Sequence, residues 1–315
     1  MSADHSIRTV GLCGAGQMGA AAAVCFRRAG YRTLLWLRNP DKLAAVRDTL
    51  DELESWMQEH VGAPSCELAR LDVVTDLSVL DNEADAIMDC IAEVMSEKAA
   101  LLSDLPRARA RRAMLLTTTS GLSISELGRR SGTGQHLVGT HFWNPPHLMP
   151  LVEVIAGDET EPEVMDRAID LIRAIGKIPV RVNRDVLGFI GNRLQHALWR
   201  EAIFLVQSGV ASAEDVDRVA RLTFALRMPA VGPLENMDLV GLDLVQTIHR
   251  YLMADLADDD QPLPLLCEHV AGGELGMKTG RGFYNWKLRD PKQTIERRDR
   301  QIVQQLEFLR KLDAL

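Results

Sequence analysis

The chain has 315 residues, 46% of them hydrophobic and 25% charged, which is typical of a globular protein large enough for two domains. Its formal net charge of -8 argues against a general nucleic-acid binder or a protein that binds acidic membranes. No apolar run approaches the ~20 residues that span a bilayer. We therefore expect neither a nucleic-acid partner nor membrane association.

Short apolar runs alternate with helical stretches in the first half of the chain, a pattern that predicts a parallel sheet covered by helices. Helices are predicted over residues 17–29, closed by Gly30, and near residues 162–174. The fold class is therefore an α/β, Rossmann-type, doubly wound and mostly parallel sheet. The predicted strands cover residues 7–13, 33–37, 71–75, 86–91, 114–118, 137–140, 151–155 and 178–182.

The second half of the chain has a different pattern. From residue 188 to about residue 249, apolar residues recur three and four positions apart, and no strand is evident. We place the domain boundary near residues 183–187, which gives a domain of residues 1–185 and an all-α C-terminal domain of residues 186–315. Within the latter we expect a loop at residues 258–264, an irregular Gly-rich segment at 275–286 and a charged terminal helix at 296–315.

Five cysteines occur singly along the sequence, without a CxxC pair, and the N-terminus shows no signal-peptide pattern. This usage indicates reduced core thiols in a cytoplasmic protein. We expect neither a disulfide framework nor a metal site. The cysteines are Cys13, Cys25, Cys66, Cys90 and Cys267.

A glycine-rich motif directly follows the first predicted strand and opens the first predicted helix. Gly14, Gly16 and Gly19 stand in G-x-G-x-x-G spacing. The first permits a tight turn, the second lets the backbone approach a pyrophosphate, and the third lets the helix pack closely on the sheet. The helix N-terminus, with Gln17 and Met18, would then face the phosphates. The motif predicts NAD or NADP binding; the alternative is a Gly-rich turn without a ligand.

The end of the second predicted strand departs from the usual pattern of an NAD enzyme. About 20 residues after the glycines, such enzymes carry an Asp or Glu that bonds the ribose 2′-hydroxyl. Leu37 occupies this position, and Arg38 follows it. Leu37 would not repel a 2′-phosphate and Arg38 could bind one, so the sequence predicts that NADP is at least tolerated. The alternatives are that Arg38 is a solvated charge or stacks on adenine.

A histidine and a glutamate flank a proline-rich turn in the segment GTHFWNPPHLMPLVEV, residues 139–154. His141 ends one predicted strand, and Glu153 lies on the next. A carboxylate bonded to one imidazole nitrogen fixes the tautomer at the other and raises its basicity. This suits a base that takes a hydroxyl proton as a hydride leaves the same carbon. The pair thus indicates a dehydrogenase of secondary alcohols, with a purely structural histidine as the alternative.

This segment resembles the H-F-x-N-P-x-x-x-M-x-L-V-E-V motif of the 3-hydroxyacyl-CoA dehydrogenase family. Further motifs of that family follow in order over almost the whole chain. The resemblance implies a Rossmann domain, a helical domain, and reversible NAD(P)-dependent oxidation of 3-hydroxyacyl-CoA to 3-oxoacyl-CoA in fatty acid metabolism. The matching stretches are T-T-T-S at 117–120, where Thr118 replaces the family's Asn, G-F-I-G-N-R at 188–193, G-P-L-E through G-L-D at 232–243, and K-T-G-R-G-F-Y at 278–284.

The resemblance also implies roles for four catalytic residues. His141 is the general base in oxidation and the general acid in reduction, and Glu153 orients and tunes it. Ser120 and Asn192 hydrogen-bond the reacting oxygen and place the carbinol carbon against the nicotinamide. The alternatives are that Asn192 caps a helix and that Ser120 is only a turn residue.

Five other positions have implied roles in binding. Glu93 and Lys98 match an acidic residue and a lysine near the cofactor ribose, although Lys98 could be a solvated helix charge. Asn144 is expected to hold the turn more than to touch substrate. His147 and Arg200 are candidate substrate contacts, and Arg200 could instead be a surface charge.

The segment at residues 41–66 bears on the substrate. In the family the CoA half lies on a helical arm after the second strand, which is usually longer and basic. A short acidic arm would repel the CoA phosphates, unless CoA binds elsewhere. A small free hydroxy acid is therefore the rival substrate, as in relatives with an N-P-P-H-x-x-P turn that act on sugar acids, carnitine or pyridine carboxylates. The charged residues here are Asp41, Asp48, Asp51, Glu52, Glu54 and Glu59 against Lys42 and Arg47.

The helical domain is apolar along residues 189–206 and 219–245, and in family members this domain forms a dimer interface. We therefore expect a two-fold homodimer. Two other functions were weighed: a non-catalytic dinucleotide-binding protein, and a hydrolase that uses Ser120 with His141. The intact catalytic residues argue against the former, and the absence of a G-x-S-x-G elbow argues against the latter.

Overall fold

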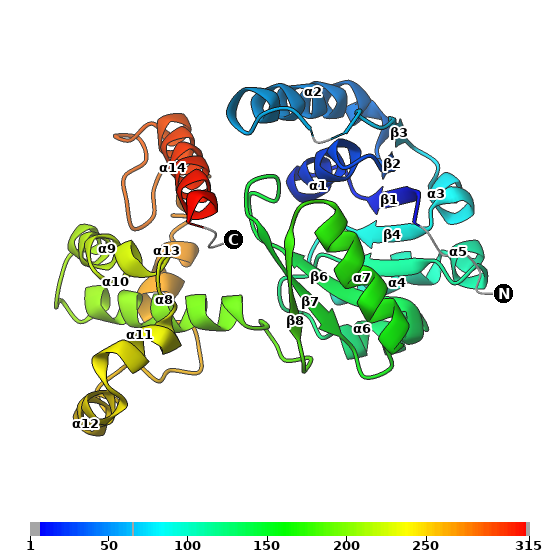
Figure 1. Ribbon diagram of the computed structural model, residues 1–315. Helices are drawn as coiled ribbons and strands as arrows, with labels where there is room; N and C mark the ends of the chain where they lie inside the picture. Colours follow the sequence, from blue (N-terminus) through cyan, green and yellow to red (C-terminus); the bar gives the residue numbers. More distant parts are fainter. Residues whose placement is uncertain (1–6, 65, 313–315) are drawn as a thin grey trace. The chain divides into compact units, whose positions relative to one another are not determined.

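The computed structural model describes residues 7–64 and 66–312. The chain divides into two compact units, Met1–Arg193 and Leu194–Leu315 (Figure 1). The first unit is a Rossmann-type α/β domain and the second is helical, which confirms the predicted fold class. In the described ranges, no helix combines the length and apolar character that crossing a membrane requires.

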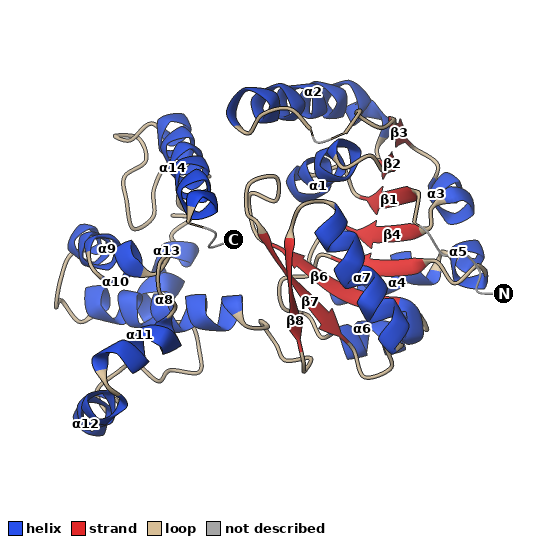
Figure 2. Cartoon of the chain, in the orientation of Figure 1, coloured by secondary structure: helices blue, strands red, loops and turns tan. Residues whose placement is uncertain are grey.

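The sheet of the first unit has eight strands in the order β3-β2-β1-β4-β5-β6-β7-β8. All neighbours pair in parallel except β6 and β7, which are antiparallel. The reversal of order at β1 and β4 is the switch point beside which dinucleotides bind in such sheets. Figure 2 shows the strands in red between helices. Their bounds are β1 Thr9–Cys13, β2 Arg32–Trp36, β3 Leu71–Val74, β4 Ala86–Asp89, β5 Met114–Thr117, β6 Leu137–Phe142, β7 Leu151–Ala156 and β8 Ile178–Val182.

Two strand ends differ from the prediction for a clear physical reason. Strand β4 ends at Asp89, two residues early, because the Asp89 carboxylate accepts the backbone N–H of Ile91 at 3.0 Å. Strand β6 runs two residues further than predicted, to Phe142, because its antiparallel partner β7 supplies a pairing residue, Val152, opposite that position. The histidine predicted at a strand end therefore lies inside the ladder.

Helices cover both faces of the sheet, and the alternation of side chains along each strand divides the core between them. On β1, Val10 and Leu12 pack on one face and Cys13 on the other. The first face is covered by α1 (Gln17–Arg28), α2 (Leu43–His60) and α7 (Pro162–Ala174). The second is covered by α3 (Leu77–Glu83), α4 (Met95–Ser103), α5 (Pro106–Ala110) and α6 (Ile124–Ser131). Two short 3₁₀ turns, η1 (Pro40–Lys42) and η2 (Gly134–His136), complete the unit.

The second unit is built from helices, as predicted, and its Gly-rich segment at residues 275–286 forms only isolated β-bridges. The terminal helix begins at Pro291, five residues earlier than predicted. Asp290 caps it by accepting the backbone N–H groups of Lys292 and Gln293, and proline suits the first helical position. Residues 313–315 of the predicted helix lie outside the described residues. The helices are α8 Gly191–Gln207, α9 Ala213–Leu222, α10 Phe224–Arg227, α11 Pro233–Val240, α12 Leu242–Leu252, α13 Pro264–Ala271 and α14 Pro291–Lys311.

The helical unit buries little apolar surface within itself. Among its described residues, the hydrophobic side chains that are buried are Ala257 and Leu263, at 9% and 4% exposure. Large apolar side chains are exposed on several of its helices, among them Trp199, Leu226 and Leu239, the last two by more than 70%. An apolar surface of this extent is typical of a protein–protein interface.

The five cysteines are all free, but they are not all core residues. Cys13, Cys25 and Cys90 are buried, and burial raises the pKa of each thiol, that of Cys90 to about 12. Cys66 and Cys267 are exposed. The prediction of core thiols is wrong for these two, because they lie outside the regular elements that form the core (Cys66) or on a helix of the poorly buried second unit (Cys267).

Candidate active site

The glycine turn between β1 and α1 has the geometry of a phosphate-binding loop. Gly14 has φ of 111°, which favours glycine. A Cβ atom at Gly19 would lie 1.8 Å from the carbonyl oxygen of Gly14, so only glycine allows this approach of helix and strand. A Cβ at Gly16 would meet no protein atom within 4 Å, which leaves open space beside the backbone.

The N-terminus of α1 is free to bind an anion. Gly16 is its N-cap residue, no side chain of the described residues caps it, and its first turn holds no acidic residue. The backbone N–H groups of Gln17, Met18 and Gly19 therefore begin a helix whose positive dipole end lies at the open side of Gly16. This arrangement fits the pyrophosphate of a dinucleotide.

The end of β2 shows why no carboxylate is available for a ribose. Leu37 is only 6% exposed, and its backbone N–H donates to the carbonyl of Val74 at 2.8 Å. Its side chain packs with the core on the α1 side of the sheet. Arg38 is exposed and follows it directly. The position of the usual acidic residue is thus filled by an apolar side chain beside an exposed cation.

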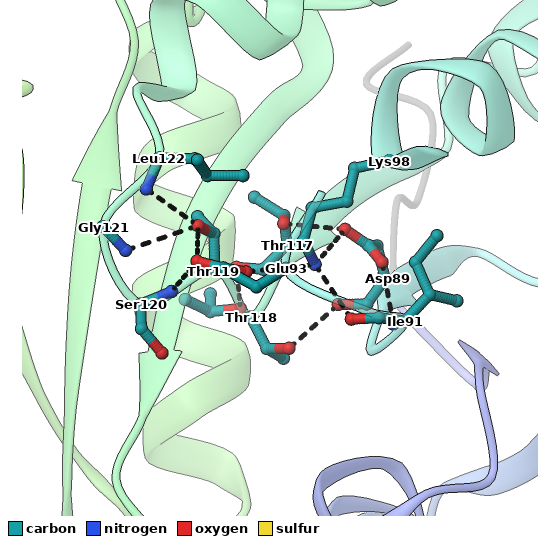
Figure 3. Close-up of polar contacts among 11 residues, drawn as sticks. Asp89, Ile91, Glu93, Lys98, Thr117, Thr118, Thr119, Ser120, Gly121 and Leu122 are labelled. Carbon is teal, nitrogen blue, oxygen red and sulfur yellow. Dashed lines mark hydrogen bonds and ion pairs between the residues drawn. The ribbon is translucent and has the colours of Figure 1, made fainter. Parts of the chain in front are cut away.

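A buried ion pair lies at the carboxyl ends of β4 and β5 (Figure 3). The Lys98 amino group donates to Asp89 Oδ2 at 2.9 Å and to the carbonyl of Ile91 at 3.3 Å. Asp89 also accepts the hydroxyl of Thr117 at 2.8 Å. Because the Lys98 and Asp89 side chains are 1% and 0% exposed, Lys98 is not a solvated helix charge. A buried charge pair of this kind needs such additional hydrogen bonds to be stable.

Glu93 joins this pair to the loop that contains Ser120. Its Oε1 accepts the hydroxyl of Thr119 at 2.6 Å and the backbone N–H of Ser120 at 2.7 Å, while Oε2 lies 3.6 Å from the Lys98 amino group (Figure 3). The Glu93 carboxylate is 44% exposed and therefore also open to a ligand. Asn192 donates from Nδ2 to the carbonyl of Ser120 at 2.6 Å. The structure thus brings together Glu93, Lys98, Ser120 and Asn192.

His141 and Glu153 face each other across the antiparallel pair β6–β7. They are directly opposed in the register, where side chains of one face meet. His141 Nδ1 lies 2.7 Å from Glu153 Oε2, and the two side chains are 5% and 2% exposed. Since an ionised carboxylate can only accept, Nδ1 donates this bond, which leaves Nε2 as the ring nitrogen for proton exchange.

The second oxygen of Glu153 is held by the backbone. Its Oε1 accepts the N–H groups of Ile190 at 2.8 Å and Gly191 at 3.0 Å. Burial alone would raise the pKa of Glu153, but the hydrogen bonds from His141, Gly191 and Ile190 outweigh burial and lower it. The carboxylate therefore stays ionised at neutral pH.

A strained segment directs these two N–H groups. Gly188 and Phe189 have φ of 75° and 51°, and the left-handed region is unfavourable for a side chain such as that of Phe189. The Phe189 ring is fully buried and its centroid lies 5.7 Å from that of His141. The centroid of the Trp143 ring lies 5.0 Å from that of His141. The imidazole is therefore confined by two aromatic rings as well as by Glu153.

The turn between β6 and β7 contains Asn144 and His147. The side-chain amide of Gln17 donates to Asn144 Oδ1 at 3.3 Å, which links this turn to the first residue of α1. His147 is half-buried, and its ring packs edge-on against Trp56 of α2 with 5.5 Å between centroids. The Gln17 amide is thus the described side-chain partner of Asn144.

Arg200 belongs to the helical unit. Its guanidinium donates to the backbone carbonyl of Asp259 at 3.1 Å, so it fastens the loop after α12 within that unit. The described partner of Arg200 is therefore a backbone carbonyl of its own unit.

Sequence analysis missed Asp89 and Lys177. Asp89 ends the apolar run A-I-M-D, and a carboxylate in such a run signals a buried, paired charge. Lys177 donates to the carbonyls of Pro146 and Met149 at 2.7 and 2.8 Å while only 9% exposed. A lysine after Gly176 at a helix end looks like an exposed charge, and no pattern in the sequence indicates its burial.

Comparison with known proteins agrees with this geometry. Residues 9–186 match the family model described as 3-hydroxyacyl-CoA dehydrogenase, NAD binding domain, and residues 188–286 match its C-terminal domain. The chain is 30% identical over 298 residues to 5-formyl-3-hydroxy-2-methylpyridine 4-carboxylate 5-dehydrogenase of Mesorhizobium japonicum, covering 94% of this chain and 96% of the relative. It is 34% identical over 286 residues to a probable 3-hydroxybutyryl-CoA dehydrogenase of Bacillus subtilis, and this match covers 89% of this chain and 98% of the relative.

A solved structure extends the likeness over nearly the whole chain. It is a 5-formyl-3-hydroxy-2-methylpyridine 4-carboxylic acid 5-dehydrogenase, described as an NAD⁺-dependent dismutase. It superposes with a TM-score of 0.91 at 30% identity, covering 97% of this chain and 99% of that structure. The match therefore includes residues beyond position 286, where the family model ends.

The glycine loop at the switch point and the histidine–carboxylate pair on β6 and β7 of the same sheet define a class of enzyme, the NAD-dependent dehydrogenases that act on hydroxyl groups. Within that class, the chain belongs to the 3-hydroxyacyl-CoA dehydrogenase family. The family resemblance is thereby confirmed, and the two other functions considered, a non-catalytic dinucleotide-binding protein and a hydrolase, are set aside.

Gly19→Ala and Gly16→Ala separate the two functions of the glycine loop. The Cβ at position 19 collides with backbone, so Gly19→Ala should destabilise the fold by about 1–3 kcal/mol. Gly16 has φ of -76°, which alanine adopts, and its Cβ would project into open space. Gly16→Ala should therefore leave urea unfolding unchanged while weakening NADH binding, measured by NADH fluorescence. Equal stabilities of the two variants would contradict the packing argument.

The lowered pKa of Glu153 predicts a pH-dependent contribution to stability. The pKa of Glu153 is lower in the folded state than the value of about 4.3 in the unfolded state, so the ionised group stabilises the fold at pH values above about 4.3. This stabilisation is lost as the pH falls through the folded-state pKa. Glu153→Gln should cost roughly 1–2 kcal/mol at pH 7, and the cost should shrink as the pH falls below about 4. Urea unfolding of both proteins across this range is the measurement. If the difference in unfolding free energy does not change with pH, the negative charge of Glu153 does not stabilise the fold.

Proposed function

We propose that the chain oxidises a hydroxyl group on a small free carboxylic acid, such as a sugar acid, a carnitine-like alcohol or a pyridine-carboxylate alcohol, without CoA. The observation that carries this proposal is the charge of α2. A CoA substrate brings a 3′-phosphorylated ADP, which needs lysines or arginines, and the segment after β2 is where the family resemblance would place it.

Helix α2 presents acidic side chains to solvent. Four acidic residues of α2 are exposed, and Glu54 is occupied by an ion pair with Arg28 of α1. The exposed bases of residues 41–60 are Lys42 and Arg47. A polyphosphate along this surface would meet net repulsion. The four acidic residues are Asp48, Asp51, Glu52 and Glu59.

The comparisons support the same substrate class. The pyridine-carboxylate dehydrogenase of Mesorhizobium japonicum aligns along 94% of this chain, and the solved structure of an enzyme of that name covers 97% of it. We therefore place a small carboxylate near the turn at residues 143–150, with His147 as the candidate contact. The His147 ring packed on Trp56 is positioned by α2 rather than free to rotate.

The second candidate substrate is a 3-hydroxyacyl-CoA. It is favoured by the 34% identity to the probable 3-hydroxybutyryl-CoA dehydrogenase of Bacillus subtilis, over 98% of that relative. This substrate would connect the chain with fatty acid metabolism. It requires a CoA-binding surface other than the exposed face of α2.

The residues of the site suit general acid–base catalysis in the proposed reaction. The bound nicotinamide would supply the acceptor for the hydride. His141 Nε2 would take the hydroxyl proton in oxidation and return it in reduction, and the ionised Glu153 would stabilise the imidazolium formed. The Ser120 hydroxyl would bind the reacting oxygen. Asn192 would act through its bond to the Ser120 carbonyl, which helps to fix the loop.

NAD is the cofactor that the family model supports, and we propose that NADP is tolerated as well. A buried Leu37 brings no negative charge to the end of β2, and the exposed Arg38 can approach a 2′-phosphate. Glu93, being partly exposed beside Lys98, remains the candidate for contact with the nicotinamide ribose.

We further propose a two-fold homodimer formed through the helical unit, in the cytoplasm. The unit has little core of its own, and its exposed apolar side chains need a partner surface. Five free thiols, two of them exposed, suit a reducing compartment, which cell fractionation would test.

Light scattering at micromolar concentration should give the mass of a dimer. Leu226→Glu places a charge on an exposed apolar side chain of α10 and should weaken association if this surface is buried between two copies. Gln293→Glu, at an exposed position of α14, adds the same single negative charge and should leave the dimer intact. A wild-type monomer would refute the proposal.

A substrate panel tests the proposed function directly. Reduction and oxidation are followed at 340 nm with hydroxy acids, pyridine-carboxylate alcohols and acyl-CoAs, each with both cofactors. We expect turnover of a free acid, and detectable kcat/KM with NADP. Efficient turnover restricted to 3-hydroxyacyl-CoA or 3-oxoacyl-CoA would overturn the substrate class, and failure of NADP would overturn the cofactor proposal. His141→Ala should abolish turnover while NADH affinity stays near the wild-type value.

A further inference from the structure

Lys177 has no role in the proton transfer described above. Its amino group donates hydrogen bonds to the turn that contains Asn144 and His147. Lys177 lies between α7 and β8, only 9% exposed. It donates to the carbonyl of Pro146 at 2.7 Å and to that of Met149 at 2.8 Å. A buried lysine is unusual unless its donors are used in this way.

The backbone around Lys177 is anchored on both sides. Its own N–H donates to the carbonyl of Ile172 at the end of α7, at 3.2 Å. The next N–H, of Ile178, donates to the carbonyl of Pro150 at 2.8 Å, where the turn enters β7. The side chain therefore extends from a rigid position, so its amino group can define where the turn lies.

The turn has few bonds of its own. Its backbone bonds are those from the N–H groups of Leu148 and Met149 to the carbonyl of Pro145, at 3.0 Å each. The carbonyl of Pro146 receives Lys177 and lies 3.9 Å from the Cys25 thiol of α1. Without Lys177, the carbonyls of Pro146 and Met149 would each lose the donor at 2.7 and 2.8 Å, and a buried carbonyl that loses its donor is unfavourable.

We propose that Lys177 is a positioning residue, which fixes the turn and thereby sets Asn144 and His147 for substrate. His141 and Glu153 are placed by the strand register and by the N–H groups of Ile190 and Gly191, and do not depend on it. Lys177 therefore acts on the placement of substrate and not on the basicity of the catalytic pair. The kinetic part of this inference rests on the proposed function, because it takes His147 as a substrate contact.

Lys177→Met removes the donors and keeps the length of the side chain. Hydrogen exchange of the Leu148 and Met149 amides should become faster by about tenfold, while exchange of Leu12 in β1 stays unchanged. With 5-formyl-3-hydroxy-2-methylpyridine 4-carboxylate or acetoacetyl-CoA as probe, kcat/KM should fall by roughly 10- to 100-fold, mainly through KM. The pH profile of kcat and the affinity for NADH should match the wild type.

Lys177→Arg, which keeps the donors, should restore most of the loss, and Lys292→Met is the matched control on an exposed lysine. If Lys177→Met does not fold, Lys177→Gln, which keeps one donor group, is measured in its place. Unchanged exchange at Leu148 and Met149, or faster exchange in β1 to the same extent, overturns the proposal. A probe panel without turnover would count against the proposed function alone, because the exchange measurement needs no substrate.

Discussion

The two oxygens of the Glu153 carboxylate connect parts of the chain that are far apart in sequence. One accepts His141 from the neighbouring strand, and the other accepts Ile190 and Gly191 from the segment that leads into α8. These hydrogen bonds more than compensate for burial, so the group stays charged where an isolated carboxyl would not. The ionised carboxylate is thus held in a fixed position beside the imidazole of His141.

The antiparallel pairing of β6 and β7 makes this contact possible. In a wholly parallel sheet, the amino ends of all strands lie on one side and the carboxyl ends on the other. A residue near the start of one strand is therefore far from a residue near the end of the next. Reversing β7 brings Glu153, early in its strand, directly opposite His141, late in its own. The one antiparallel strand pair of the described sheet is therefore the place where His141 and Glu153 meet. The parallel strands β1, β4 and β5 bring the glycine loop, the Asp89–Lys98 pair and the Ser120 loop to that same edge.

Two surfaces of the molecule are distinctive in composition: the exposed face of α2 is acidic, and the helical unit exposes apolar side chains. The His141–Glu153 pair, the Ser120 loop and the glycine turn are the parts of the site that bear on the proposed reaction. Helix α2 presents an excess of exposed acidic side chains, which would oppose the binding of phosphate groups along its surface. The helical unit leaves large apolar side chains exposed on several of its described helices.

The sequence by itself determined the class of the sheet, the glycine loop and the His141–Glu153 pair, because each depends on local spacing or strand alternation. It also predicted most strands to within two residues. Only the tertiary structure decided that Lys98 is buried against Asp89, that Glu93 fastens the Ser120 loop, and that Lys177 supports the turn. These contacts join residues from separate elements of the chain. The sequence around a charged residue does not show whether that residue will be hydrated or paired with a buried group, because this depends on how the elements pack.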